Sequence, residues 1–144
     1  MHMINIAAIA AAVRGDSAML RRIGSVLSGL ATFTALELIL SLLARATWPA
    51  YATAFPTRAY TPDMLLARQT AGMLCTLAAG AATAWVGRGA KQVVLLTGIT
   101  MLGIAVIWHI RIWDQYPVWY HLLLFAYLIP LTLLGGRLVG NNRK

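Results

Sequence analysis

Charged residues are scarce in this chain. Asp, Glu, Lys and Arg make up 11% of its 144 residues, whereas hydrophobic residues make up 60%. The mean hydropathy is +0.72. A soluble globular domain has about 25% charged residues, so this composition cannot cover a surface that faces water. The sequence therefore predicts an integral membrane protein with lipid against much of its surface.

Acidic residues are the rarest charged type, with 4 Asp and Glu against 12 Lys and Arg and a net charge of +8. Nucleic acid is not an expected partner, because no stretch provides a basic face with interleaved stacking aromatics. The cations instead divide between the two sides of the predicted spans. Eight lie on one side: Arg14, Arg21, Arg22, Arg88, Lys91, Arg137, Arg143 and Lys144. Four lie on the other: Arg45, Arg58, Arg68 and Arg111. The positive-inside rule then predicts that both termini are cytoplasmic.

Cysteine occurs once, at Cys75. A single cysteine excludes an intramolecular disulfide and the paired thiols of a redox enzyme, so Cys75 is expected to be a small buried hydrophobe. The turn at residues 87–91, GRGAK, does not match a phosphate-binding loop. The sequence also offers no nucleophile–base set and no metal-ligand cluster. We therefore expect no enzyme activity, no cofactor and no metal.

Four apolar runs are each long enough to cross about 30 Å of hydrocarbon. They cover about residues 23–48, 62–87, 91–113 and 117–136. The predicted fold is all-α, an antiparallel bundle of four transmembrane helices that forms one domain over residues 23–137.

The flanking segments carry three further expectations. Residues 1–22 are predicted to be a cytoplasmic tail or a short interfacial helix, because their apolar run is too short to span. Residues 138–144 are predicted to be a cytoplasmic tail. Residues 50–61 are expected to form an outer loop whose aromatic side chains lie against the membrane surface.

Small residues recur at helical spacing in the second predicted span. Gly72, Thr76, Gly80 and Ala84 follow one another every four residues, and Gly29 lies in a similar pattern in the first span. Small side chains let helices approach closely in membranes. The second span is therefore predicted to be the most buried helix of the bundle.

Polar residues gather near the outer ends of the predicted spans. They are Glu37, Arg68, Gln69, His109, Arg111, Asp114 and His121. The helix rise of about 1.5 Å per residue makes a Glu37–Arg68 contact feasible. That pair could fix helix packing, or the residues could form a ligand pocket or a proton relay. A third alternative is a protonated Glu37 that bonds the backbone or Thr34.

The two histidines of this set are weak metal or haem candidates. His109 and His121, with Asp114, lack the tight spacing of a metal site, and bis-histidine haem ligation normally needs ligands on facing helices. Interfacial roles are predicted for both histidines.

Aromatic residues concentrate in residues 108–121, with one more tryptophan at the end of the first span. The set is Trp48, Trp108, Trp113, Tyr116, Trp119 and Tyr120. Such belts anchor proteins at the membrane interface. A docking surface for a partner membrane protein is the alternative, since Trp and Tyr are enriched there.

The leading functional prediction is a small polytopic inner-membrane protein of bacterial type, acting as a non-enzymatic accessory, assembly or interaction subunit. Its partners would be the lipid bilayer and a membrane protein or a second copy of the chain. The alternative is a small transporter or channel that uses the outer polar residues. A membrane enzyme acting on lipid or quinone comes third.

Overall fold

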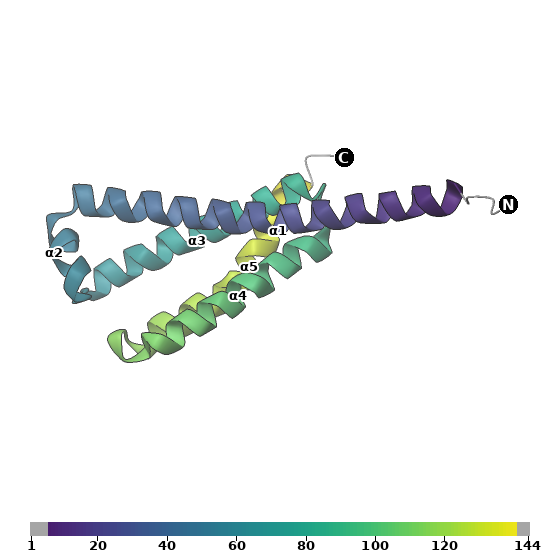
Figure 1. The fold of residues 1–144 in the computed structure, drawn as a ribbon. Coiled ribbons are helices and arrows are strands. Elements are labelled where there is room, and N and C mark those ends of the chain that lie inside the picture. Colours follow the sequence, from purple (N-terminus) through teal and green to yellow (C-terminus); the bar gives the residue numbers. More distant parts are fainter. Residues whose placement is uncertain (1–5, 141–144) are drawn as a thin grey trace.

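The computed structural model describes the backbone of residues 6–140 and the side chains of residues 15–140. These residues form five α-helices and one short 3-10 helix (Figure 1). They are α1 (Ile6–Thr47), α2 (Pro49–Thr57), α3 (Pro62–Val86), α4 (Lys91–Arg111), η1 (Trp113–Gln115) and α5 (Val118–Gly140). The all-helical prediction is confirmed for the described residues.

Three of these helices are long and apolar enough to cross a membrane. They are α1 over Gly15–Thr47, α4 and α5. Many large hydrophobic side chains on these helices are exposed on the protein surface, among them Leu27, Ile39, Ile99 and Leu122. Apolar side chains exposed along helices of this length fit a multi-pass membrane protein, since lipid then covers them.

Helix α3 has the length of a span but a lower hydropathy. Its 25 residues extend about 38 Å, yet many of them are Ala, Gly or Thr, and Asp63 and Arg68 lie in its first two turns. Large apolar side chains are not needed on α3, because this helix packs against both α1 and α5 and exposes less of its surface to lipid. A fourth span at α3, and with it the antiparallel four-helix membrane bundle, stays a prediction.

The contact between α3 and α5 is a close crossing of two backbones. A Cβ atom at Gly80 of α3 would collide with the backbone carbonyl of Thr132 on α5. Gly135 of α5 approaches the backbone of Leu77 on α3 in the same way. Only residues without a side chain allow this approach, which places the two helix axes close together.

The contact between α1 and α3 also depends on a glycine. Gly29 of α1 lies against Thr83 of α3 and leaves no room for a Cβ atom. The Thr83 hydroxyl donates to the carbonyl of Ala79, so its polar group is satisfied within α3. Thr76 and Ala84 of the predicted packing set are buried as well.

The N-terminal segment differs from its prediction. Helix α1 begins at Ile6 and continues without a break to Thr47, so the chain has no separate tail or interfacial helix between residues 6 and 22. The segment is rich in alanine and contains no proline, and Gly15 alone does not end a helix. The 42 residues of α1 extend about 63 Å, and Figure 1 shows the helix projecting past the others. Residues 1–5 lie outside the described part.

The C-terminal boundary also differs. Helix α5 continues to Gly140 instead of ending near residue 136, so residues 138–140 are helical. Residues 141–144 lie outside the described part. Figure 1 shows the N-terminal end of α1 and the C-terminal end of α5 on the side of the molecule away from α2. The cytoplasmic location of both ends stays a prediction.

The expected outer loop contains a helix. Residues 49–57 form α2, which starts with Pro49 in its first turn, where proline is tolerated, and is followed by Arg58 at a left-handed φ of 57°. Tyr51 and Ala54 pack against Met64 of α3. The prediction that the loop aromatics lie on the membrane surface is therefore wrong for Tyr51, which is 2% exposed.

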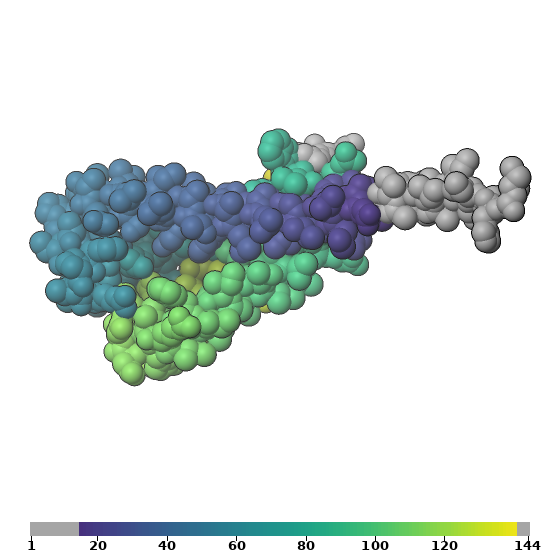
Figure 2. Space-filling model, in the orientation of Figure 1, coloured from purple at the N-terminus to yellow at the C-terminus, as the bar shows by residue number. Residues whose placement is uncertain are grey.

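At the α2 end, the helices separate into two arms. Figure 1 shows α1 and α3 with α2 on one arm and the lower parts of α4 and α5 on the other. The space-filling view shows a hollow between them near that end (Figure 2). Two adjoining cavities lie there, and they contain most of the polar residues singled out in the sequence.

Candidate ligand-binding cavity

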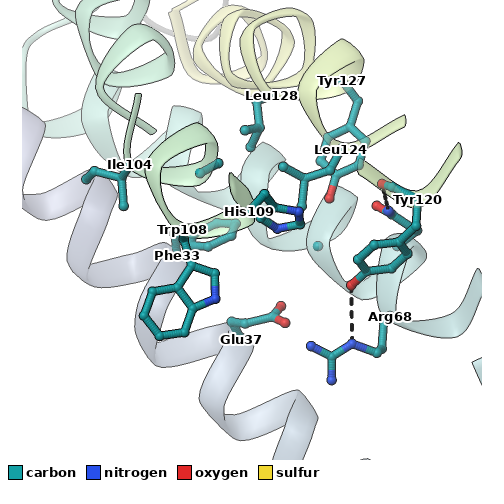
Figure 3. Close-up of a pocket in the computed structure, with 13 residues that line it drawn as sticks. Phe33, Glu37, Arg68, Ile104, Trp108, His109, Tyr120, Leu124, Tyr127 and Leu128 are labelled. Carbon is teal, nitrogen blue, oxygen red and sulfur yellow. Dashed lines mark hydrogen bonds between the residues drawn. The ribbon is translucent and has the colours of Figure 1, made fainter. Parts of the chain in front are cut away.

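A cavity of about 320 Å³ lies between α1, α3, α4 and α5 and is called the inner cavity below. Its polar side chains are Glu37, Arg68, Gln69, His109, Tyr120 and Tyr127 (Figure 3). Its apolar walls include Phe33, Ile104, Trp108 and Leu124. Four of the seven polar residues predicted from the sequence therefore line one cavity.

Arg68 is held by three tyrosine hydroxyls. Its Nη1 donates to Tyr51 at 2.8 Å and to Tyr60 at 3.4 Å, and its Nε donates to Tyr120 at 3.3 Å. These tyrosines come from α2, from the segment before α3, and from α5. Burial raises the pKa of Tyr60 to about 12, so its hydroxyl stays protonated beside the guanidinium at neutral pH.

The predicted contact between Glu37 and Arg68 is not formed among the described residues. Both side chains line the inner cavity, but Arg68 is bonded to the tyrosines instead. The prediction failed because Tyr51 was assigned to the membrane surface, whereas α2 folds it back over α3. A guanidinium has five N–H donors, so three hydroxyls can hold it without a carboxylate.

Glu37 reaches the cavity from the C-terminal third of α1. Figure 3 shows its carboxylate pointing into the space between Arg68 and His109. Its Oε2 is buried and has no hydrogen-bond partner among the described residues, and the thiol of Cys75 lies beside it. Thr34 donates to the Leu30 carbonyl instead, so the suggested Glu37–Thr34 bond is not formed either.

Gln69 carries a second unpaired acceptor. The residue is 2% exposed, and its Nε2 donates to the backbone carbonyl of Tyr120 at 2.6 Å. That bond fixes the amide orientation and leaves Oε1 buried, again without a partner among the described residues. Two side chains that line the cavity, from two different helices, thus each carry a buried acceptor atom without a hydrogen-bond partner among the described residues.

The two histidines contact each other. His109 Nδ1 and His121 Nδ1 are 2.6 Å apart, and His121 Nε2 lies 3.2 Å from the carbonyl oxygen of Trp113. A carbonyl can only accept, so His121 Nε2 carries the hydrogen and its Nδ1 is bare in a neutral ring. His109 Nδ1–H must then donate to His121.

This chain of hydrogen bonds fixes the tautomer of His109. Both rings are buried, and a buried imidazolium without an acidic partner would be costly, so we treat both as neutral. His109 is then bare at Nε2, which makes it a third acceptor on a side chain that lines the inner cavity. His121 does not line the cavity but lies behind His109.

Arg111 and Asp114 are exposed and do not line either cavity. Arg111 follows His109 by two positions, about 200° around an α-helix, and so faces away from it. Asp114 lies in η1 at the surface. Of the six ionisable residues in the predicted polar set, Glu37, Arg68 and His109 therefore line the cavity and the other three do not. No cluster of three or more metal-ligating side chains occurs within the described part of the chain.

The aromatic belt is divided as well. Trp108, Trp113 and Trp119 are exposed, whereas Trp48 and Tyr116 are half-buried. Tyr120 is buried and bonded to Arg68. The exposed tryptophans suit interface anchoring, while Tyr120 forms part of the cavity wall.

A second cavity of about 390 Å³, the outer cavity, adjoins the inner one near α2. The two share Arg68, Trp108, His109 and Tyr120 as lining residues. Besides the hydrogen bonds of Arg68 and Gln69 to Tyr120, two further contacts link the arms at this end. Arg58 donates to the side-chain oxygen of Gln115, and the rings of Tyr60 and Tyr116 stack with centroids 6.1 Å apart.

Several lining residues were not predicted from the sequence. Tyr51 and Tyr60 bind Arg68, and Tyr127 lines the cavity where Gly72 leaves room for its hydroxyl. The glycine was noted for helix packing, but nothing in the sequence indicates which aromatic residue approaches it.

Comparison of the chain with protein-family models, with curated proteins and with solved structures gave no match.

Proposed function

We propose that this multi-pass membrane protein binds a small molecule in the inner cavity. The observation that carries the proposal is the pair of buried acceptors, Glu37 Oε2 and Gln69 Oε1, on side chains that line the same cavity. An unpaired buried polar atom costs about 1–3 kcal/mol. A ligand that donates hydrogen bonds to both atoms removes that cost, which favours binding.

The size and lining of the cavity support the same conclusion. Small-molecule pockets measure about 300–1,000 Å³ and combine apolar walls with a few placed polar groups. The inner cavity has about 320 Å³ and joins the larger outer cavity through shared lining residues. The polar groups come from α1, α3, α4 and α5, so the fold must be complete before they meet.

We place the protein in the inner (plasma) membrane of a bacterial-type cell, with both termini in the cytoplasm. The eight-to-four division of the cations supports this orientation. The cavities then lie in the outer half of the bilayer, beside Arg45, Arg58 and Arg111. An accessory or assembly role stays a prediction, because the cavity is built from this chain alone and gives that role no specific support.

The test is the identification of small molecules that remain bound after purification in mild detergent. Denaturing the protein and analysing the extract by mass spectrometry should give one compound at close to one per chain. Glu37→Met and Gln69→Leu should lose it. Thr100→Val should retain it, because the half-buried Thr100 bonds only its own helix and does not line the cavity.

The proposal is wrong if the parent protein retains no small molecule and both cavity variants unfold at the same temperature as Thr100→Val. In that case the two acceptor atoms bind no ligand, and replacing them changes neither ligand retention nor the unfolding temperature.

A further inference from the structure

We propose that the ligand is an uncharged amphiphile with hydroxyl donors on its head group, and that it enters from the bilayer between α1 and α4. The proposal rests on the proposed ligand-binding function and adds the chemical class and the route. It follows from which hydrogen-bond partners the cavity lacks, from its charge, and from where it opens.

The buried polar atoms that lack a hydrogen-bond partner among the described residues are acceptors. Glu37 and Gln69 each present a carbonyl or carboxylate oxygen with no partner among the described residues. His109 presents Nε2, because its Nδ1 is committed to His121. A head group that fits three acceptors from three helices must carry several donors. Hydroxyl groups meet this requirement, whereas esters, ethers and ketones do not.

The charges of the cavity favour a neutral head group. Arg68 is its only cation among the described lining residues, and Glu37 is its only acid. Two of the three guanidinium nitrogens of Arg68 already donate to tyrosines, so little of it is left to bind an anion. An ammonium head would be attracted by Glu37 but repelled by Arg68, so the cavity gives it no net electrostatic advantage.

The cavity opens toward lipid. Two of its lining residues on α4, Ile104 and Trp108, are 56% and 57% exposed. On the α1 side, an open hollow lined by Phe33, Glu37 and the exposed Leu38 adjoins Arg68. Apolar side chains therefore border both sides of the opening, which suits an apolar tail that remains in the bilayer.

The route from water is narrower. At the α2 end the two arms are linked by the Arg58–Gln115 hydrogen bond and by the stacked rings of Tyr60 and Tyr116. Both contacts lie over the outer cavity, whose lining includes Arg58, Tyr60 and Tyr116. Among the described residues, no hydrogen bond or ring stacking of this kind joins α1 to α4, where a ligand with a long apolar tail would arrive.

The experiment compares amphiphiles that share one tail and differ in the head group. The purified protein in lipid nanodiscs is titrated with monoolein, methyl oleate, oleate and oleylamine, and the thermal unfolding midpoint is recorded. Monoolein offers two hydroxyl donors and methyl oleate offers none. Monoolein should bind the parent about tenfold to a hundredfold more tightly than methyl oleate, the ratio expected for one hydrogen bond to a charged group.

Two sources could supply a hydroxyl head group in a membrane, a partial glyceride or a quinol. A second pair of probes, a short-chain benzoquinol and its oxidised quinone, separates them. Tighter binding of the quinol than of monoolein assigns the site to quinols, and the reverse order assigns it to glycerides. Either result supports the hydroxyl class, because the quinone, like methyl oleate, carries no donor.

The matched variants are Glu37→Met and Thr100→Val. Glu37→Met removes an acceptor but places an apolar side chain on an apolar helix, so it should fold and melt at or above the temperature of the parent without ligand. It should lose the preference for monoolein, and Thr100→Val should keep it.

Equal binding of monoolein and methyl oleate, or tightest binding of oleate or oleylamine, would overturn the proposed ligand class. A charged or water-soluble compound retained on purification would also overturn it, while leaving the proposed binding function intact.

Discussion

The two ends of this helix bundle are held together in opposite ways. Where α3 crosses α5, glycines bring the backbones into contact through Gly80 and Gly135. At the α2 end, bulky aromatic and polar side chains stand between the arms, and two cavities remain. The same apolar helices thus give a closely packed region and a hollow one. The size of the side chains between the helices decides whether a region is closely packed or hollow.

The comparison suggests a division of roles. Close packing stabilises the fold where no polar group has to be reached. At the other end, the separation of the helices keeps Glu37, Gln69 and His109 accessible to a ligand. The same separation leaves acceptor atoms without hydrogen-bond partners. The predictions that follow test this division, from the largest expected effect to the smallest.

The largest effect is expected from Gly80→Leu. Its side chain would have to displace the backbone of Thr132, which cannot move aside as a side chain could. We expect a loss of about 3 kcal/mol or more in the free energy of unfolding, at or above the usual range for overpacking. Gly103→Leu is the control, because nothing lies within 4 Å of a Cβ atom at Gly103. Thermal unfolding in mild detergent should rank the two variants clearly, and equal midpoints would mean that the crossing is not closely packed.

Next in size is Arg68→Leu. It leaves three tyrosine hydroxyls without their shared donor, and a hydrogen bond to a charged group contributes about 1.5–3 kcal/mol. We expect a loss of about 2–3 kcal/mol, because the cavity relaxes around the smaller side chain. Arg111→Leu removes the same residue type from an exposed position and should change the stability by less than about 0.5 kcal/mol. Similar melting of the two variants would show that the tyrosines do not hold Arg68.

A smaller effect is expected at the histidine pair. His121→Phe keeps a ring against Trp113 but removes both hydrogen bonds of His121, at a cost of about 1–2 kcal/mol. Nitrogen-15 spectra of histidine-labelled protein test the assignment directly. We expect the hydrogen on Nδ1 in His109 and on Nε2 in His121, and a His2→Asn background removes the third histidine signal. Two rings that both carry the hydrogen on Nε2 would contradict the assignment.

The smallest effect is expected from Arg58→Ala. The hydrogen bond from Arg58 to Gln115 links the two arms at an exposed position, where such contacts contribute less than about 1 kcal/mol. We expect the unfolding midpoint to stay close to that of Arg22→Ala, an exposed cation on α1. A large loss would mean that the α2 end is held as firmly as the helix crossing.

Sequence reasoning went furthest for the helices of the second half of the chain. Pro62 and the glycine-containing turn at residues 87–90 mark the limits of α3, because proline suits a helix start and the turn requires glycine at a φ of 77° at Gly89. It failed where a boundary depended on packing. Residues 50–61 look like a loop, yet α2 forms because Tyr51 gains burial and a bond to Arg68.

The candidate site was predicted in part. Glu37, Arg68 and His109 stood out because ionisable residues are rare in apolar helices. Their partners could not be derived, since Tyr51 and Tyr120 are separated from Arg68 by 17 and 52 residues. His109 faces the cavity and Arg111 does not because of the rotation of α4 about its axis. That rotation is fixed by the packing of α4 against α5, α1 and α3.

The sequence alone determined that this chain is helical and apolar enough for lipid, because composition and run length decide both independently of how helices meet. The tertiary structure alone decided that Glu37 and Gln69 share a cavity without partners, and that Arg68 binds tyrosines and not Glu37. The physical reason is the distance along the chain over which each interaction acts. Hydropathy and helix propensity act within a few residues of sequence. A hydrogen bond between helices depends on their rotation and separation, which arise only when every helix has packed against its neighbours.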